Sequence, residues 1–343
     1  MLFAYPDAAT QNNWLHECLC KIIETIHKSV DLGVNVPDWP EIVPDNYREI
    51  LTSRTGLRKK TSKYADKIQM LLHQKRATVY DALINQNRIT ELLNGSGECD
   101  KIADLPISIQ DPILDLFGFA FELLTEFDIR DQQYRCIYDA LPAKVCPFCG
   151  LELFDAPGAR REALDHYLAK SIYPFAAANL CNLIPMGNKC NSLKGAIDIL
   201  WKNGVRRLSF DPYNPPNFAI SLDNSQLFAR ENETLPDWVI EFYPPMQEID
   251  TWDDVFDIRN RYARGILDPS FKDWIGDFRY WHMRSQTVNA GQSLANTINS
   301  YIDSLERFGF RDQSFLKVAV FRLFRKQVQQ GNSRLIKLLV DPT

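Results

Sequence analysis

Residues 146–195 read CPFCGLELFDAPGARREALDHYLAKSIYPFAAANLCNLIPMGNKCNSLKG, and this stretch decides how the rest of the chain is interpreted. It holds four cysteines, a single histidine next to an aspartate, and several asparagines among many turn-forming residues. These side chains bind metals, move protons or accept hydrogen bonds, whereas the flanking sequence shows mainly the apolar spacing of helices. The segment is therefore the first place to look for a functional site.

Cys146 and Cys149 form a CxxC pair, the spacing at which a tight turn directs two thiolates at one metal ion. A pair of buried or redox-active thiols is the alternative. A second CxxC would complete a four-cysteine zinc site, but Gly187 stands where its first cysteine is expected and Cys190 remains alone. Cys181 could serve as the fourth ligand; otherwise the site has three ligands or has lost its metal.

Asp165 and His166 follow the apolar Leu164, which predicts that they lie at the end of a strand. There, neighbouring side chains are held rigidly but diverge, so one can bind a metal ion while the other faces a water molecule. An Asp-His pair in an exposed loop is the plain alternative. Asn182 and Asn191 follow in order, the latter at the expected start of a helix, and the complete set is more specific than any of its parts.

In this order, DH, then N, then CN with KG, after an opening CxxC, the segment resembles the HNH (ββα-metal) endonuclease family in its His-Asn-Asn variant. The resemblance covers residues 146–195. It implies two strands and a helix folded around one divalent cation, and hydrolysis of phosphodiester bonds in nucleic acid, with DNA favoured. It is also similar to bacterial HNH proteins of anti-phage defence, some of which work beside an SMC-like or AAA-type ATPase, so such an ATPase is an expected partner.

The resemblance also implies a role for each motif residue. Asp165 and Asn191 would hold the catalytic cation, Mg or Mn, and His166 would take a proton from the attacking water. Asn182 would brace the loop and keep the imidazole oriented. The three cysteines of the CxxC pair and of position 190 correspond to family ligands of a structural zinc ion.

The chemistry of these residue types agrees with such roles. Phosphodiester hydrolysis needs an activated water, neutralisation of charge on the transition state and help for the leaving oxygen. A histidine near its ordinary pKa of roughly 6.5 accepts a proton at neutral pH, and a carboxylate with an amide oxygen suits a hard cation. Two metal sites of different softness are therefore expected.

Basic side chains near the motif and in the N-terminal part are candidate contacts to phosphate. Residues 53–76 carry eight basic residues against one acid, although the chain has a net charge of −5. A solvated helix face is the alternative for this run, and an ordinary surface position is the alternative for each lysine of the motif. The candidates are Arg58, Lys59, Lys60, Lys63, Lys170 and Lys194, and Lys189, Arg160 and Arg161 lie equally close to the motif.

The composition favours a folded, soluble protein. Of 343 residues 45% are hydrophobic, enough to fill ordinary cores in two or three domains. No apolar run approaches the roughly 20 residues that a membrane span needs, and the N-terminus lacks the pattern of a signal peptide. We expect a cytoplasmic protein with reduced cysteines and no membrane contact.

The sequence predicts an α+β fold in which a ββα-metal module is embedded between mostly helical N- and C-terminal domains. Apolar residues recur at helical spacing up to about residue 113, a short acidic helix is expected at residues 111–127, and a few short strands are expected around residues 206–244. The expected domains are residues 1–140 (helical), 141–205 (the module) and 206–343 (short strands, then helices).

In a second hypothesis, the chain has the fold of the ββα-metal module but lacks nuclease activity. The chain would then be a catalytically inactive, zinc-stabilised subunit of a larger complex that binds nucleic acid or acts as a scaffold. The glycine at position 187, where a cysteine is expected, is its main support.

Overall fold

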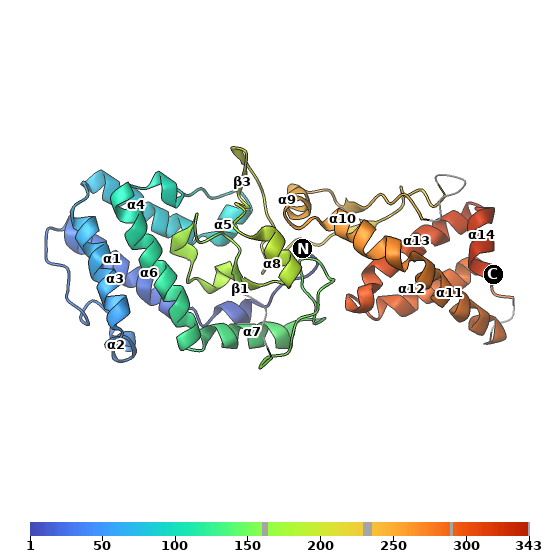
Figure 1. Cartoon of the computed structure of the whole chain (residues 1–343), viewed down its shortest axis with the longest axis horizontal. Coiled ribbons are helices and arrows are strands. Elements are labelled where there is room, and N and C mark those ends of the chain that lie inside the picture. Colours follow the sequence, from blue (N-terminus) through green and yellow to red (C-terminus); the bar gives the residue numbers. More distant parts are fainter. Residues whose placement is uncertain (160–163, 229–234, 289–290, 342–343) are drawn as a thin grey trace. The chain divides into compact units, whose positions relative to one another are not determined.

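The computed structural model describes residues 1–159, 164–228, 235–288 and 291–341, and is mostly helical with short antiparallel strand pairs (Figure 1). This confirms the expected α+β class. The chain forms two compact units: the first comprises Met1, Phe3–Leu141 and Phe154–Pro215, and the second comprises Leu2, Pro142–Leu153 and Pro216–Thr343. Most of the segment expected to form a separate module thus shares a unit with the N-terminal helices.

The first unit combines helices with two pairs of short strands. Its elements are η1 (Asp7–Thr10), α1 (Trp14–Asp31), α2 (Asp45–Leu51), α3 (Thr55–Gln69), α4 (His73–Gln86), α5 (Ile89–Leu93), η2 (Ile102–Asp104), α6 (Ile107–Glu126), α7 (Ile129–Ala140), β1 (Leu164–His166), η3 (Pro174–Ala176), η4 (Leu180–Asn182), β2 (Leu183–Pro185), α8 (Asn188–Lys194), β3 (Trp201–Lys202) and β4 (Val205–Arg206).

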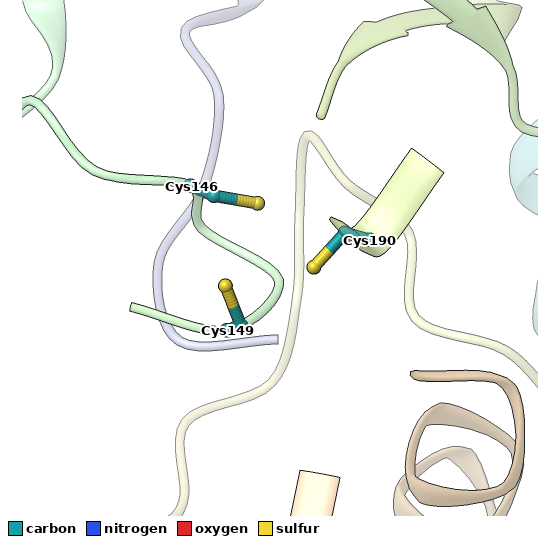
Figure 2. A group of neighbouring side chains, drawn as sticks. All are labelled: Cys146, Cys149 and Cys190. Carbon is teal, nitrogen blue, oxygen red and sulfur yellow. The ribbon is translucent and has the colours of Figure 1, made fainter. Parts of the chain in front are cut away.

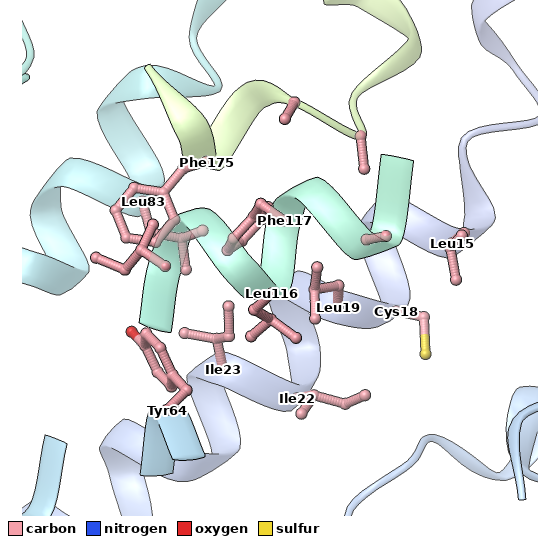
Figure 3. Close-up of a cluster of buried hydrophobic side chains, with 14 of the residues drawn as sticks. Leu15, Cys18, Leu19, Ile22, Ile23, Tyr64, Leu83, Leu116, Phe117 and Phe175 are labelled. Carbon is pink, nitrogen blue, oxygen red and sulfur yellow. The ribbon is translucent and has the colours of Figure 1, made fainter. Parts of the chain in front are cut away.

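The core of this unit forms where α1, α3, α4 and α6 meet η3 (Figure 3). Apolar residues of α1 recur every three or four positions, so one face of the helix is buried. Phe117 of α6 meets Phe175 of η3 edge to face, with ring centroids 5.1 Å apart, and both side chains are fully buried. The segment between β1 and β2 is therefore anchored in the helical core.

The strands β1 and β2 pair antiparallel, with Asp165 opposite Ile184 and His166 opposite Leu183. The amide of Tyr167 donates to the carbonyl of Asn182 at 2.9 Å and extends this ladder beyond the strand. Helix α8 begins three residues after β2, so the order is strand, strand, helix. The predicted strand end at Asp165 and His166 and the predicted helix at Asn191 are both confirmed.

The second unit carries one strand pair and a group of helices. Its elements are β5 (Ala219–Ser221), β6 (Glu241–Tyr243), α9 (Gln247–Phe256), α10 (Ile258–Tyr262), the π-helical η5 (Ala263–Leu267), α11 (Asp268–Val288), α12 (Leu294–Glu306), η6 (Arg311–Gln313), α13 (Ser314–Gln329) and α14 (Ser333–Val340). The turn at residues 146–149 is held by hydrogen bonds from Trp252 to the carbonyl of Phe148 and from Tyr262 to the carbonyl of Cys149. Among the described residues, no helix combines the length and the apolar character needed to cross a membrane.

The anchoring of η3 in the helical core gives a stability prediction. Phe175→Ala removes a fully buried ring that packs on Phe117, so we expect the free energy of unfolding in urea to fall by about 3–5 kcal/mol. The control is Phe308→Ala, the same change at a side chain that is 46% exposed, with an expected cost of about 0.5 kcal/mol or less. Equal losses for the two variants would contradict the anchoring role.

Candidate functional site

The candidate site lies where the end of β1 meets α8. The Nζ atom of Lys194, the last residue of α8, is 3.1 Å from Oδ2 of Asp165 in β1. Lys194 is fully buried and also donates to the carbonyl of Gly195 at 3.1 Å. The sequence suggested a phosphate contact for Lys194, but the structure directs its ammonium to the carboxylate expected to hold a cation.

Charge and burial oppose each other in this ion pair. Burial lowers the pKa of Lys194, whereas the charge of Asp165 and the contact with its carboxylate raise it. Oδ2 of Asp165 is itself buried, and although it lies at ion-pair distance from Lys194 it accepts no hydrogen bond of good geometry. The ammonium of Lys194 is therefore the charged partner of this oxygen, and a metal cation that used the same oxygen would compete with it.

Asn191 lies three residues before Lys194 on α8 and is half-buried. Residues three apart are neighbours on a helix surface, and the contact between Lys194 and Asp165 brings this side of α8 to the end of β1. The structure therefore brings the carboxylate of Asp165 and the ammonium of Lys194 together, and Asn191 lies about one turn earlier on the same helix.

His166 packs inside the protein with its ring centroid 4.4 Å from that of Phe121 on α6, and only 6% of the residue is exposed. Its Nε2 atom lies 2.9 Å from the carbonyl oxygen of Ala177. A carbonyl can only accept, so Nε2 carries the proton and Nδ1 of the neutral ring is left as an acceptor. Within the described part of the chain, Nδ1 takes part in no hydrogen bond.

Burial lowers the pKa of His166 to about 3, with smaller contributions from the positive charges of Lys170, Lys194 and Arg130; the hydrogen bond to Ala177 acts in the opposite direction. The expected pKa near the ordinary histidine value is therefore wrong, because the sequence did not show that α6 would cover the ring. At neutral pH the imidazole is uncharged, ready to accept a proton but a weak base in the free protein.

Asn182 locks the loop between β1 and β2. Its amide is fully buried, donates to the carbonyls of Leu168 at 3.0 Å and Ala176 at 3.2 Å, and accepts from the amide of Leu168 at 2.7 Å. Ala176 precedes Ala177, whose carbonyl binds His166. These hydrogen bonds hold the loop that carries the partner of His166, and the role of Asn182 in orienting the imidazole stays a prediction.

Two buried glutamines from the helices support the same loop. Gln86 of α4 accepts from the amide of Phe175 at 3.0 Å, and Gln133 of α7 donates to the carbonyls of Leu180 and Leu183 at 2.9 and 3.0 Å. Neither glutamine was predicted from the sequence. The helical periodicity places both on the apolar face of their helices, and this was the available signal. A buried amide must find hydrogen-bond partners inside the protein.

Three buried cysteines form a second cluster. The ligand atoms of Cys146, Cys149 and Cys190 all lie within 4.8 Å of one another (Figure 2), and the group could hold a metal ion. A tight turn positions Cys146 and Cys149. The amide of Gly150 donates to the carbonyl of Cys146 at 2.7 Å, and the amide of Leu151 donates to Sγ of Cys149 at 3.5 Å. Gly150 has a φ of +69°, which favours glycine.

Cys181, the suggested fourth ligand, does not belong to this group. The side chain of Asn179 accepts a hydrogen bond from the amide of Cys181 and fixes its place in η4. There the thiol interacts with Thr10, and its pKa is raised, chiefly by burial. Within the described residues, the group therefore consists of three cysteines.

The candidate phosphate contacts fall into different environments. Lys170 is exposed, with its Nζ atom 4.9 Å from the ring centroid of Phe121 beside His166. On α3, Lys63 pairs with Asp115 at 2.8 Å, and Lys60 lies over the ring of Phe119 at 5.5 Å. Arg58, Lys59 and Lys189 are exposed, and Arg160 and Arg161 lie outside the described residues.

The three hydrogen bonds of Asn182 predict a local effect of its removal. Asn182→Ala leaves buried backbone groups of Leu168 and Ala176 without partners, so we expect a loss of at least about 2 kcal/mol in the free energy of unfolding. Hydrogen exchange should also accelerate at the amide of Leu168. Asn188→Ala, at an exposed position of α8, is the control and should change neither quantity. Unchanged exchange at Leu168 in the first variant would contradict the bracing role.

Comparisons with models of protein families, with curated proteins and with solved structures found no match for this chain. The interpretation of the site therefore depends on the geometry of its own residues.

Proposed function

We propose that this chain is a divalent-cation-dependent nuclease that hydrolyses phosphodiester bonds in nucleic acid, with DNA as the expected substrate. The supporting observation is the pair at the end of β1. His166 has Nδ1 left as an acceptor by the bond from Nε2 to Ala177, and the neighbouring Asp165 has a buried carboxylate oxygen that is paired with Lys194 at 3.1 Å. The order β1, β2, α8 is also that of the ββα-metal module which the sequence resembles.

The residues present fit a hard divalent cation. Asp165 offers a carboxylate and Asn191 an amide oxygen, which are ligands that Mg and Mn prefer. A cation would bind at Oδ2 of Asp165 in competition with the ammonium of Lys194. A cation bound there would supply charge neutralisation at the phosphate and assistance to the leaving oxygen.

The remaining steps belong to the protein. His166 accepts the proton of the attacking water at Nδ1, and the resulting imidazolium keeps its Nε2 hydrogen bond to Ala177. Asn182 holds the loop that carries this carbonyl, so the ring cannot turn away from the water. A phosphodiester bound nearby would bring negative charge that offsets Lys170 and Arg130 and makes the imidazole a stronger base.

Two observations favour a second function. The ammonium of Lys194 pairs with the carboxylate that the cation needs, and the imidazole is almost completely buried. Both features suit a catalytically inactive, zinc-stabilised subunit that binds nucleic acid or serves as a scaffold. This candidate predicts binding in EDTA and no cleavage with any cation.

The partners expected from the resemblance remain part of the proposal. A role in anti-phage defence beside an SMC-like or AAA-type ATPase would give the large helical part of the chain a docking role. Purification of the tagged protein from its own cells, followed by identification of the proteins bound to it, tests this expectation.

The proposed reaction makes a direct prediction for His166. His166→Ala should lower Mg- or Mn-dependent cleavage of plasmid DNA by at least about 100-fold, because the proton acceptor is lost. His73→Ala is the matched control, since the His73 side chain is 75% exposed and lies outside the site. Cleavage by the His166 variant at the rate of the unmodified protein would refute the role of the imidazole. Complete lack of cleavage by the unmodified protein, with DNA binding intact in EDTA, would instead support the scaffold.

The buried ion pair gives a second prediction. Lys194→Met keeps the volume of the side chain but leaves the Asp165 carboxylate without its cation, so we expect a lower melting temperature in EDTA. Mn²⁺ should restore the melting temperature, and the variant should bind Mn²⁺ more tightly than the unmodified protein, because a competing positive charge is gone. Lys189→Met, at an exposed position of the same helix, is the control. A variant with unchanged affinity for Mn²⁺ would place the cation away from Asp165.

We further propose that the three buried cysteines hold a structural zinc ion, because thiolates in tetrahedral arrangement prefer zinc. The purified protein should contain zinc by mass spectrometry of the elements, and Cys190→Ser should remove most of it. Cys181→Ser is the control and should retain the metal, since this thiol lies outside the group. Full zinc content in the Cys190 variant would exclude this site.

A further inference from the structure

A pocket of about 280 Å³ lies in the first unit, and none of its lining residues belongs to the candidate site. It is lined by Asn85 of α4, by Glu98 and Asp100 of the segment before η2, and by Trp201 and Arg206 of the hairpin formed by β3 and β4. Ligand pockets commonly have volumes of about 300–1,000 Å³, so this one is at the small end. Its ligand is therefore expected to be one ring system rather than a long chain.

The hairpin wall of the pocket is held in place by the protein itself. Trp201 and Arg206 are direct partners in the pairing of β3 with β4. The guanidinium of Arg206 donates to the backbone carbonyls of Leu200 at 3.0 Å and Arg207 at 2.7 Å, and to that of Leu92. These bonds fix the guanidinium against the backbone, so a ligand would meet a preformed surface.

Asp198 fixes the turn that leads into this hairpin. Its carboxylate accepts from the hydroxyl of Tyr173 at 3.0 and 3.1 Å and from the amide of Leu200 at 3.0 Å, and it pairs with the ammonium of Lys101 at 2.8 Å. That ammonium lies 5.5 Å from the ring centroid of Trp201. The indole therefore has a defined place in the pocket wall.

Several polar groups of the pocket keep the capacity to bind a ligand. A guanidinium has more N–H donors than the three hydrogen bonds of Arg206 use, and Arg206 pairs with no carboxylate among the described residues. The side chains of Asn85, Glu98 and Asp100 form no hydrogen bond or ion pair within the part of the chain that the structure describes. The pocket thus offers donors and acceptors together.

The charges of the pocket favour a ligand that is itself uncharged. The carboxylates of Glu98 and Asp100 repel a phosphate group, whereas the guanidinium of Arg206 repels a metal ion or an amine. Trp201 and Arg206 both present flat surfaces on which an aromatic ring stacks. A neutral, planar heterocycle with both donors and acceptors, which is the description of a nucleobase, fits these conditions.

Among the nucleobases, guanine matches both sets of polar groups. Its O6 and N7 atoms are neighbouring acceptors, which a guanidinium binds through its N–H donors. Its N1–H and its 2-amino group are neighbouring donors, which a carboxylate accepts. Adenine has an acceptor at N1 in place of this donor and carries no 2-amino group, so it leaves the carboxylates of the pocket without partners.

We propose that this pocket binds a guanine base, with Arg206 as the donor to O6 and N7, Glu98 and Asp100 as acceptors for N1–H and the 2-amino group, and Trp201 as a stacking surface. The base belongs either to a nucleic-acid strand or to a free guanine nucleotide. The inference goes beyond the proposed nuclease, because a base can bind here without any cleavage.

The first test uses guanosine monophosphate, titrated into the whole chain without added Mg or Mn and followed by calorimetry. We expect it to bind at least about tenfold more tightly than adenosine monophosphate and than inosine monophosphate, which lacks the 2-amino group. Glu98→Gln combined with Asp100→Asn should weaken its binding at least about tenfold and remove most of the preference over inosine monophosphate. Glu122→Gln combined with Asp66→Asn, at exposed positions outside the pocket, is the matched control and should leave the affinity unchanged.

Two further variants test the hairpin wall. Trp201→Leu removes the aromatic surface and should weaken the binding of guanosine monophosphate about tenfold. Arg206→Lys keeps the charge but loses the planar set of donors, so it should weaken binding as well. Arg206 also holds the backbone of the hairpin, so the melting temperature of each variant is measured. Glu98 and Asp100 are exposed, and their variants decide the matter even where Arg206→Lys does not fold.

A second probe separates the two sources of the base. A fluorescein-labelled strand of thymidines with one central guanine is compared by fluorescence anisotropy with the same strand that carries hypoxanthine at that position. Tighter binding of the guanine strand, reversed by guanosine monophosphate, identifies a base of a bound strand. Binding of guanosine monophosphate without a preference between the strands identifies a free nucleotide.

The inference is overturned if the unmodified protein neither binds guanosine monophosphate nor distinguishes the two strands, or if the Glu98 and Asp100 double variant retains full affinity for guanine. Its failure is distinct from that of the nuclease. A protein that cuts DNA with Mg or Mn but does not distinguish guanine refutes the pocket and leaves the nuclease standing. A protein that binds guanine but never cuts supports the pocket and refutes the nuclease.

Discussion

The contact between the buried ammonium of Lys194 and the carboxylate of Asp165 is the interaction on which the site depends. It joins the end of α8 to β1, two elements whose sequence separation includes the whole loop and β2. Neither charge would be stable there alone, because burial penalises an unpaired ion. The pair therefore fixes where the end of helix α8 lies against the strand.

The helices of the first unit complete the site as well as supporting it. Phe175 anchors the loop in their core, Gln133 of α7 holds the loop's carbonyls, and Phe121 of α6 covers the imidazole. A segment of about fifty residues can supply the motif but has too little apolar surface to bury it, since small domains leave most of their surface exposed. This explains why most of the expected module, residues 154–205, shares a compact unit with the N-terminal helices.

The sequence predicted local features well and tertiary surroundings poorly. The strand that ends at Asp165 and His166, the helix at Asn191, the acidic helix near residues 111–127 and short strands in residues 206–244 all follow from periodicity and turn residues, and the structure has them. The burial of Lys194 and the lowered pKa of His166 depend on which elements cover them, and no local pattern encodes that.

In the proposed nuclease, the buried, neutral imidazole would be a poor proton acceptor while no substrate is bound. Burial, and to a smaller extent the charges of Lys170, Lys194 and Arg130, lowers the pKa of His166, so the imidazole is uncharged through the neutral range. An anionic ligand reverses the sign of the local field, which would strengthen the base when there is a bond to cleave. In the proposed function, these charges would favour an anionic ligand, and the negative charge of that ligand would raise the pKa of His166.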